Sequence, residues 1–382
     1  MAVIFVTVLV DMLSFGILIP DLQLRANSFG ASGLELGLLI AGFSIAQFVV
    51  SPFAGRLSDR YGRKPILMAG ALLNCSSYLV YAFAHTVPAI VAARVLGGIG
   101  ASNLAAAYAY VADVSAPEAR AKSMGFLGAA FGLGFVMGPP MGGLLAHAGG
   151  NRLLGIVSAS IVLGNFIWIA ISMGDTREHS RATIFSPRDL LKAMAVPALA
   201  ILLLMFFAYN FGFSNMESTF VLFANKKFGL NQEGSGLFLG YVGILIAIVQ
   251  GLLVGPLTKR FGEKNLARFG LLLVAPALAM IPYMQSVPLL MVNAVFLCLG
   301  SGLATPSIAS LISKSASTSI QGGVFGVTHG LSALARIFGP VVGQTALARS
   351  LSLPYLIAGG LVMISVAVAW LFVGRFSPAG ST

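Results

Sequence analysis

Charged residues are scarce in this chain. Asp, Glu, Lys and Arg make up only 9% of its 382 residues, whereas 57% are hydrophobic and the mean hydropathy is +0.92. A soluble domain of this length cannot bury so much apolar surface. The composition therefore excludes a soluble globular protein and indicates a protein of the lipid bilayer.

Cysteine is almost absent, and the sequence contains no motif for nucleotide binding. The two cysteines, Cys75 and Cys298, both fall inside apolar stretches, which excludes a disulfide framework and a cysteine metal site. No Gly-x4-Gly-Lys-Ser/Thr loop is present, so we expect no ATP drive. No nucleophile–base arrangement stands out either. We therefore expect no enzyme, no cofactor and no bound metal.

Long apolar stretches fill nearly the whole chain. A membrane-spanning helix needs about 20 mostly apolar residues. Twelve stretches satisfy this, so we predict an all-α membrane protein. The predicted spans are 2–20, 34–57, 65–84, 87–112, 122–147, 152–173, 193–224, 233–258, 265–285, 288–313, 321–349 and 351–374. Met1 leads directly into the first of them, which we interpret as a retained helix and not a signal peptide.

The net charge is +11, with 23 Lys and Arg against 12 Asp and Glu. In a soluble protein this excess would suggest nucleic acid. Here twelve spans place most of the basic residues in loops on the side of the N-terminus, which is the bias of cytoplasmic loops. The charge pattern predicts a multi-pass protein of the cell membrane with both termini in the cytoplasm, in contact with membrane lipids and without a nucleic-acid partner. We expect a monomer.

The two halves of the chain resemble each other. A charged segment, 174–192, separates a half at 1–173 from a half at 193–382. The loop Gly55–Lys64 matches Gly255–Lys264, 200 residues further on. A Gly/Pro pattern in the fifth span recurs in the eleventh at an offset of 201: Gly125, Gly138, Pro139 and Gly142 match Gly326, Gly339, Pro340 and Gly343. Two parallel six-helix repeats predict a transporter with its substrate site between the halves, near the bilayer midplane.

Five local patterns now carry a family resemblance. They are Asp11-x4-Gly16-x3-Pro20, the loop Gly55–Pro65, Arg94-Val-Leu-Gly-Gly-Ile-Gly100, Gly134-x3-Gly138-Pro139-x2-Gly142-Gly143, and Phe211-Gly-Phe-Ser-Asn-Met-Glu217. Over its whole length the chain resembles a major facilitator superfamily transporter. Within that superfamily it is similar to the twelve-helix drug:proton antiporters of the tetracycline and quinolone efflux type. The resemblance implies two pseudo-symmetric six-helix bundles and transport by alternating access.

The loop between the second and third spans is a candidate conformational latch. Gly55 and Gly62 permit close backbone approach, and Arg60 can meet lipid phosphates. Asp59 can cap a helix end or pair with Arg63.

The resemblance implies that Asp59 and Arg63 interact with Asp113, at the end of the fourth span, and with the start of the eleventh. The alternative is an ordinary basic loop. In the second half Lys259 replaces Asp59, and we expect a weaker latch there, or none.

The fifth span carries the antiporter motif Gly134, Gly138, Pro139, Gly142 and Gly143. Proline kinks a helix, and a row of glycines makes a smooth face for another helix. The resemblance implies a seam that closes each access path in turn. The alternative is tight helix packing with no further role.

Three charged residues lie inside predicted spans and are candidates for proton coupling. Asp11, Arg94 and Glu217 would each be costly in the bilayer unless they face a cavity or one another. Asp11 and Arg94 could form a structural ion pair. Glu217 has no obvious fixed partner, so we predict that it is the main proton carrier, with Asp11 second and Arg94 balancing their charge. The alternative for Glu217 is a wetted acid near a helix end.

Five further residues are candidates for the substrate cavity. Phe207 and Phe211 suit an apolar, tolerant pocket. His329 and Arg336 lie seven residues apart, on one helix face. His329 is a possible titrating group or a satisfied core histidine, and Arg336 could hold an anionic group or pair with Glu217. Asn293 stands near the place of a second acid in some quinolone pumps.

The leading prediction is proton-coupled efflux of amphipathic small molecules. A lipid or lysolipid transporter of the same fold is the first alternative, distinguished by a lateral opening lined with Phe. A non-transporting receptor or scaffold is the second, and the charges inside the spans argue against it.

Overall fold

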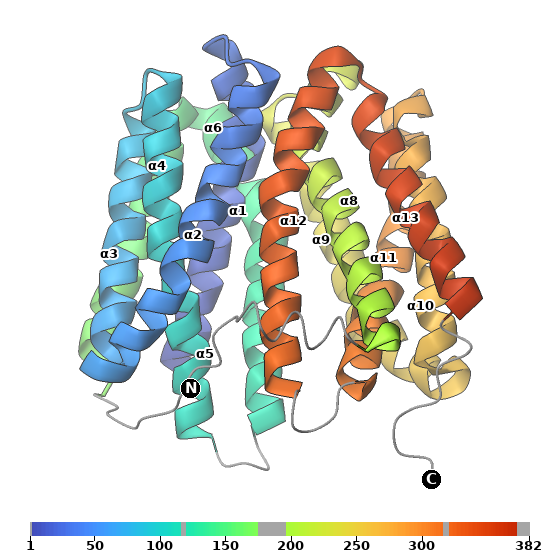
Figure 1. Cartoon of the computed structure of the whole chain (residues 1–382). Helices are drawn as coiled ribbons and strands as arrows, with labels where there is room; N and C mark the ends of the chain where they lie inside the picture. Colours follow the sequence, from blue (N-terminus) through green and yellow to red (C-terminus); the bar gives the residue numbers. More distant parts are fainter. Residues whose placement is uncertain (1, 116–119, 175–195, 316–320, 373–382) are drawn as a thin grey trace. The chain divides into compact units, whose positions relative to one another are not determined.

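The structure, a computed structural model, describes residues 2–115, 120–174, 196–315 and 321–372, and in these ranges it contains helices and no strands (Figure 1). The helices of the first half are long and apolar, as the composition predicts. They are α1 (Ala2–Ser28), α2 (Gly33–Tyr61), α3 (Arg63–Ala82), α4 (Val87–Gly100), α5 (Leu104–Val114) and α6 (Arg120–Ser172). A short 3-10 turn, Ala101–Asn103, joins α4 to α5, so these two helices form one crossing.

The helices of the second half follow the same plan. They are α8 (Pro197–Phe228), α9 (Gln232–Ile248), α10 (Val254–Met280), α11 (Val287–Ser315), α12 (Gln321–Arg349) and α13 (Leu353–Phe372). A π-helical turn at Val249–Leu253 joins α9 to α10, and a 3-10 turn, Ile281–Tyr283, follows α10.

Two of the continuous helical stretches cross the bilayer twice. The stretches Ser123–Ser172 and Gln232–Tyr283 contain 50 and 52 residues. At about 1.5 Å per residue each is more than twice the ~30 Å hydrocarbon thickness. Gly149 and Gly150 interrupt the first with non-helical torsions, and Gly262 interrupts the second with φ +75°. The ten candidate spans of the described residues therefore amount to twelve crossings, as predicted.

The first helix is longer than the sequence analysis predicted. The predicted span ends at Pro20, but α1 continues through Pro20 to Ser28. Its last two turns carry Asp21 and Arg25, which are 4% and 8% exposed. Polar side chains could be buried there because neighbouring helices supply hydrogen-bond partners, as described below.

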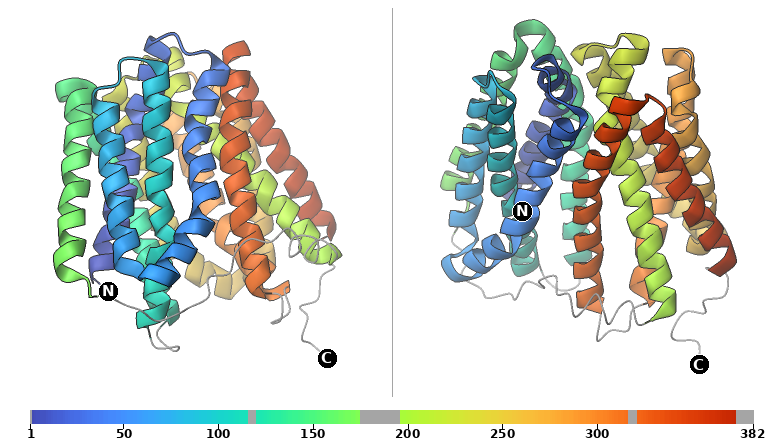
Figure 2. Two further views of the ribbon diagram at one scale, coloured as in Figure 1. Left: turned by 60° about the vertical axis from the view of Figure 1, so that its left-hand side comes forward. Right: turned by 45° about the horizontal axis from the view of Figure 1, so that its top comes forward.

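By their internal contacts the helices form two units. The first comprises Met1–Ala182 and Ala224–Gly243, and the second Thr183–Phe223 and Ile244–Thr382. In the first unit α1 packs along α6, and α3 packs against α4 and α6 (Figure 2). In the second unit α10 packs against α11 and α13. The segment 174–192 predicted as a linker lies outside the described residues except for Gly174, and the boundaries 1–173 and 193–382 stay predictions.

The sequence repeat is also visible in the backbone. Five described residues have a positive φ and all are glycines. Gly30 and Gly62, at φ +79° and +93°, follow α1 and α2; Gly229 and Gly262, at +70° and +75°, occupy the matching turns of the second half. A side chain is strained in this region of torsion space, so these turns require glycine.

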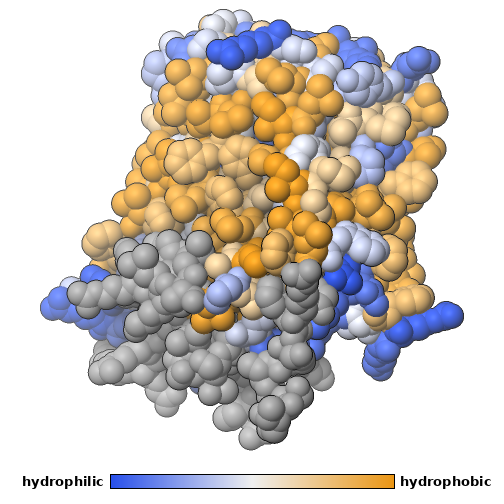
Figure 3. Space-filling view, turned by 45° about the vertical axis from the view of Figure 1, so that its right-hand side comes forward, coloured by the Kyte–Doolittle hydropathy of each residue, from blue (hydrophilic) through white to orange (hydrophobic). Residues whose placement is uncertain are grey.

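The core and the surface are both apolar. In the first unit, buried side chains of α1, α3, α5 and α6 form one cluster that includes Val8, Leu67, Val111, Leu127 and Ile169. Hydrophobic side chains also form a broad band across the face in Figure 3, with hydrophilic ones gathered toward its ends. A helix that is apolar on all sides suits a bilayer.

Candidate functional site

Asp11 is a buried carboxylate in the middle of α1. It is 7% exposed and accepts a hydrogen bond of 3.4 Å from Asn74 Nδ2. Among the described residues no cation forms an ion pair with it. The ion pair between Asp11 and Arg94, which the sequence leaves open as an alternative, is therefore not formed in the structure.

Arg94 lies against two aromatic rings that also contact each other, since the ring centroids of Phe15 and Phe43 are 5.1 Å apart. Its guanidinium carbon lies 4.4 Å from the ring centroid of Phe43 and 5.3 Å from that of Phe15. The residue is 5% exposed, and its Nε atom has no hydrogen-bond partner. Such cation–π contacts strengthen when they are desolvated. Arg94 thus stays charged inside the bundle without a carboxylate beside it.

The glycines that follow Arg94 explain its position. A Cβ on Gly97 would come within 2.9 Å of Ser77 Oγ, and one on Gly98 within 3.0 Å of the Phe43 carbonyl carbon. Only a helix without side chains on that face can approach α2 and α3 so closely. The close approach brings α4 near enough to α2 for the Arg94–Phe43 contact.

Glu217 and Arg336 are the corresponding charges of the second unit. Glu217 lies on α8 and is half-buried, whereas Arg336 on α12 is exposed, as is His329. Glu217 and Arg336 interact electrostatically, but the described residues contain no ion pair of 4.0 Å or less between them. Glu217 thus has no ion-pair partner among the described residues, although Arg336 is close enough to interact with it electrostatically.

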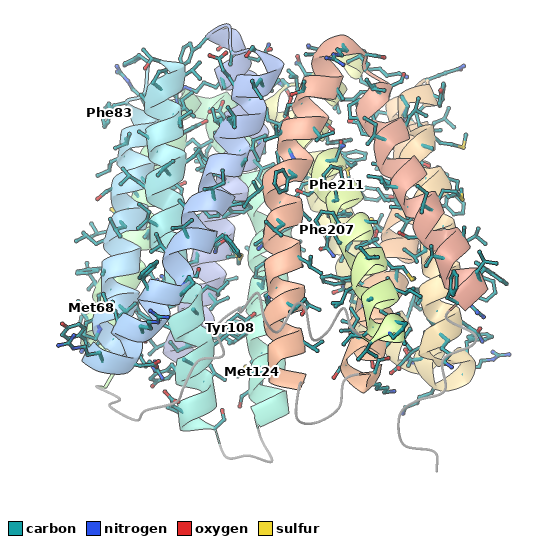
Figure 4. The ribbon with its side chains drawn as sticks, viewed as in Figure 1. Met68, Phe83, Tyr108, Met124, Phe207 and Phe211 are labelled. Carbon is teal, nitrogen blue, oxygen red and sulfur yellow. The ribbon has the colours of Figure 1, made fainter. Side chains whose placement is uncertain are left out.

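The aromatic candidates lie on α8. Phe207 and Phe211, one turn apart, have ring centroids separated by 6.0 Å (Figure 4). Between them in sequence, Tyr209 accepts a 3.0 Å hydrogen bond at its hydroxyl from Thr305 Oγ1 of α11. Sequence reasoning missed this pair. Asn293 is buried and donates to the Ala277 carbonyl at 2.9 Å, so its amide holds α11 to α10. Its role in a substrate cavity stays a prediction.

The predicted latch residues do come together in the first half. Arg63 is 1% exposed and donates to Asp113 Oδ2 at 2.9 Å, to Asp59 Oδ1, and to Ser58 Oγ at 3.0 Å. The three acceptors come from α2 and α5. Arg60 stacks on Tyr61, with its guanidinium carbon 5.3 Å from the ring centroid, and is not part of this network. The structure thus joins the ends of three helices through one guanidinium.

The second half, where the sequence predicts a weaker latch or none, contains an ion pair that is more exposed than that of Arg63 and Asp113. Glu263, at the turn into the second part of α10, forms an ion pair of 2.8 Å with Lys314 at the end of α11. The exposed Lys259, which replaces Asp59, takes no part in it. The second half thus lacks the counterpart of Asp59 but has an ion pair between two other residues, Glu263 and Lys314.

The antiporter motif of α6 has two contact faces. On one face, a Cβ on Gly138 would lie 2.7 Å from the Leu13 carbonyl oxygen and 2.7 Å from Gly16 Cα of α1. Gly134 and Gly142 make similarly close backbone approaches to α1.

The second face of the motif meets α9. A Cβ on Gly143 would lie 2.6 Å from the Gln232 carbonyl oxygen, and Gly236 approaches the Pro139 carbonyl. Gly125 and Gly128, nearer the start of α6, have open space at the same positions. The close packing therefore covers the motif, which lies midway along α6, and does not extend back to Gly125 and Gly128.

A polar cluster at the C-terminal end of α1 was missed by the sequence analysis. Tyr81 Oη donates to Asp21 Oδ2 at 2.6 Å, and Gln232 Nε2 of α9 donates to Asp21 Oδ1 at 3.5 Å. Beside it, His147 and Glu233 lie 3.7 Å apart. The signal for this cluster was Asp21 and Arg25, four residues apart just beyond Pro20, but the predicted span ended before them.

The geometry defines a class of protein: a twelve-crossing, two-repeat membrane protein with isolated charges inside its helices, which is the organisation of a secondary transporter. The chain belongs to the Major Facilitator Superfamily, whose family model matches residues 4–340 and again 244–381. This confirms the resemblance inferred from the motifs, and the chain is a transporter of that superfamily.

Similar proteins include bacterial drug exporters. The chain is 28% identical over 373 residues to "Multidrug resistance protein 1" of Bacillus subtilis (strain 168), covering 97% of this chain and 96% of the relative. It is 29% identical over 395 residues to "Tetracycline resistance protein, class C" of Escherichia coli, covering 100% and 98%. Among solved structures it is similar to the human organic anion transporter MFSD10 (TETRAN), with a TM-score of 0.71, 25% identity and coverage of 96% and 98%.

Proposed function

We propose that the protein exports amphipathic small molecules in exchange for protons by alternating access. The observation that carries the proposal is Asp11: a carboxylate buried in a membrane helix with no cation within ion-pair distance among the described residues. A buried, uncompensated charge is costly, and uptake of a proton removes it. Such a group can alternate between a charged and a neutral form as access changes.

The same observation reverses the order of the two candidate acids. On the sequence alone, Glu217 ranks first because it has no obvious fixed partner, whereas Asp11 could pair with Arg94. In the structure Asp11 is buried and accepts a hydrogen bond from the Asn74 amide, while Glu217 is half-buried near Arg336. A neighbouring cation favours the charged carboxylate. We therefore assign proton coupling first to Asp11, with Arg94 as a fixed positive charge, and place Glu217 nearer to the substrate.

The contacts of α6 support alternating access. Near the middle of α6 the motif glycines meet α1 and α9 at backbone distance, while Gly125, Gly128 and Gly132, nearer its start, have open space at their Cβ positions. A smooth glycine face that is packed along only part of its length allows another helix to approach the remainder without moving side chains. This is the property that a seam needs if it opens and closes at opposite ends in turn.

The relatives support the substrate class. The names of the bacterial relatives refer to multidrug and tetracycline resistance. The aromatic pair Phe207 and Phe211 suits an amphipathic compound. We further propose cytoplasmic termini, a monomeric state and the cell membrane as location, on the positive-inside pattern of the sequence.

A second candidate substrate class is organic anions. Arg336 is an exposed cation inside a membrane helix, and Arg94 has aromatic partners but no ion pair among the described residues. Arg336 is the charge that a carboxylate or sulfonate can reach, because Arg94 is only 5% exposed. The human organic anion transporter MFSD10 is similar to this chain over 96% of its length. Lipid or lysolipid transport remains a further alternative.

The test is a transport assay in proteoliposomes with a panel of cationic, neutral and anionic amphipathic compounds. An imposed pH gradient should drive uphill export, with protons released on the opposite side. Asp11→Asn should bind substrate but lose the dependence on the gradient by at least about tenfold, whereas Glu217→Gln should keep it. Glu35→Gln, an exposed acid that caps α2, is the control. If Asp11→Asn still exports uphill with proton exchange, the assignment fails.

A further inference from the structure

The ion pair Glu263–Lys314 occupies the repeat position of the latch in the first half. Residue 263 follows Arg63 by 200 positions, and residue 314 follows Asp113 by 201. These are the offsets at which the charged loops and the Gly/Pro patterns of the two halves align. At the turn, the base Arg63 of the first half corresponds to the acid Glu263 of the second. At the end of the partner helix, the acid Asp113 corresponds to the base Lys314.

The backbone places the two central residues alike. Arg63 directly follows Gly62, at φ +93°, and Glu263 directly follows Gly262, at φ +75°. Both glycines interrupt the helical torsions, so the next residue begins a new helical segment and its side chain turns toward the neighbouring helix end. The equivalence therefore rests on the turn geometry as well as on the alignment.

The partners around Glu263 complete a small network. Lys314 Nζ donates to both carboxylate oxygens at 2.8 Å, and Ser310 Oγ donates to Oε1 at 2.7 Å. Arg63 likewise has a serine partner, Ser58, besides its acids. Charge-assisted hydrogen bonds of this length are the stronger kind. Each half thus ties a turn to a helix end with one central charge and one hydroxyl.

We propose that Glu263, Ser310 and Lys314 form a second latch of inverted charge, which biases the inward–outward equilibrium together with the latch of Arg63. The inference extends the alternating-access part of the proposed function. Reversing both signs of an ion pair leaves its Coulomb energy unchanged. The second half can therefore have Lys259 in place of the acid Asp59 and still contain an ion pair between the turn and the helix end.

The two latches differ in their exposure to water. The side chains of Arg63 and Asp113 are 1% and 5% exposed, whereas those of Lys314 and Glu263 are 61% and 18% exposed. Exposed pairs are screened by salt and contribute less than buried ones. The second latch should therefore respond to ionic strength, and the first should not.

The test is a double charge reversal. Glu263→Lys and Lys314→Glu each place like charges together, and the double variant restores an inverted pair. The control is Lys259→Glu, which makes the same change of charge as Lys314→Glu on the exposed turn outside the network. The reporter is Gly128→Cys, where a Cβ has open space, in a background with Cys75→Ser and Cys298→Ser. The rate of maleimide labelling measures how accessible this face of α6 is.

Each single reversal should change the labelling rate about two- to fivefold in the same direction, as expected for a partly exposed pair. The double variant should return to the parental rate, and the single effects should vanish in about 1 M salt, where the screening length is about 3 Å. Glu263→Gln and Lys314→Gln, with smaller effects, serve if a reversal does not fold. A double variant that stays shifted, or a control that shifts equally, overturns the proposal.

The labelling is performed without substrate and without a pH gradient. Failure of the Asp11→Asn prediction would remove proton coupling and leave this result standing. Failure of the charge reversal would remove the second latch and leave proton coupling untouched.

Discussion

The helix pair α1–α6 and its counterpart α8–α12 are built on the same glycine pattern but pack differently. Gly138 of α6 faces Gly16 of α1, and a Cβ there would meet backbone at 2.7 Å. At the repeat position, Gly339 of α12 faces Ser214 and Asn215 of α8, and the corresponding distances are 3.0 and 3.1 Å. The second pair has room for a polar side chain where the first has only glycine.

The two helix pairs also differ in whether their buried polar side chains have hydrogen-bond partners. Asn215 is 0% exposed and neither its Nδ2 nor its Oδ1 atom has a hydrogen-bond partner, a burial that costs about 1–3 kcal/mol. In the first pair the buried Asp11 of α1 has a hydrogen-bond partner, the Asn74 amide of α3, at 3.4 Å. The same repeat thus gives a tightly packed helix pair, α1–α6, whose buried acid has a hydrogen-bond partner. It also gives a more loosely packed pair, α8–α12, which buries an amide without one.

The largest expected effect is a difference in stability and transport between substitutions of Arg94 and of Arg336. Arg94→Gln removes a cation that contacts the rings of Phe15 and Phe43, and we expect a loss of about 2 kcal/mol of stability together with most transport. Arg336→Gln, at an exposed position, should leave stability within about 0.5 kcal/mol and affect only anionic substrates. Thermal unfolding in detergent and the proteoliposome panel measure both. Equal destabilisation by the two variants would contradict the comparison.

The seams themselves can be compared by adding one methyl group. Gly138→Ala should cost about 1–3 kcal/mol, because the new Cβ meets backbone that cannot move aside. Gly339→Ala should cost less, about 1 kcal/mol, since Ser214 Cβ lies further away. Gly128→Ala is the control, with nothing within 4 Å. Unfolding temperatures in one detergent rank the three variants, and a rank order with Gly339→Ala first would refute the argument.

The polar group of the second seam offers a smaller effect of opposite sign. Asn215→Ala removes two unpartnered polar atoms and leaves a small cavity, so the two terms nearly cancel. We expect a change within about 1 kcal/mol, on the stabilising side. Asn74→Ala, which removes the hydrogen bond to Asp11, is the matched variant in the first half and should destabilise. Calorimetry that finds both equally destabilising would show that Asn215 has a partner.

The smallest expected effect concerns the two latches. Lys314→Arg keeps the charge at an exposed position and should change stability and transport by less than about 0.5 kcal/mol in either free energy. Arg63→Lys should lower the unfolding temperature clearly, because an ammonium cannot reproduce the planar fork that bonds Asp59, Asp113 and Ser58. If neither Lys314→Arg nor Arg63→Lys changed the unfolding temperature, the difference in exposure between the two ion pairs would not affect stability.

The fold was predictable from the sequence, whereas the pairing of charges was not. Span length, the positive-inside bias and the repeat depend on composition averaged over many residues. The partner of Asp11 depends on the rotation of α1, α3 and α4 about their axes, which glycines such as Gly97 set through contacts invisible in one sequence. Glu263–Lys314 was missed because the halves were compared residue by residue with the sign of each charge retained.

The boundary of α1 failed for a related reason. Proline often ends a helix, but Pro20 lies inside one, and the polar residues beyond it are satisfied by tertiary contacts. Local signals describe a helix in isolation, and in a bundle the neighbours decide where it ends.

Arg25 has a consequence for the order in which the chain assembles. Its guanidinium donates to the Tyr81 carbonyl at 2.8 Å and to that of Ala84, so α1 supplies the cap for the end of α3. The acceptors lie 56 and 59 residues later in the chain. At about 5–20 residues per second, the ribosome needs roughly 3–12 s to make them. During that interval a lone arginine must rest at the lipid interface, and its burial has to wait for the third helix to insert beside the first.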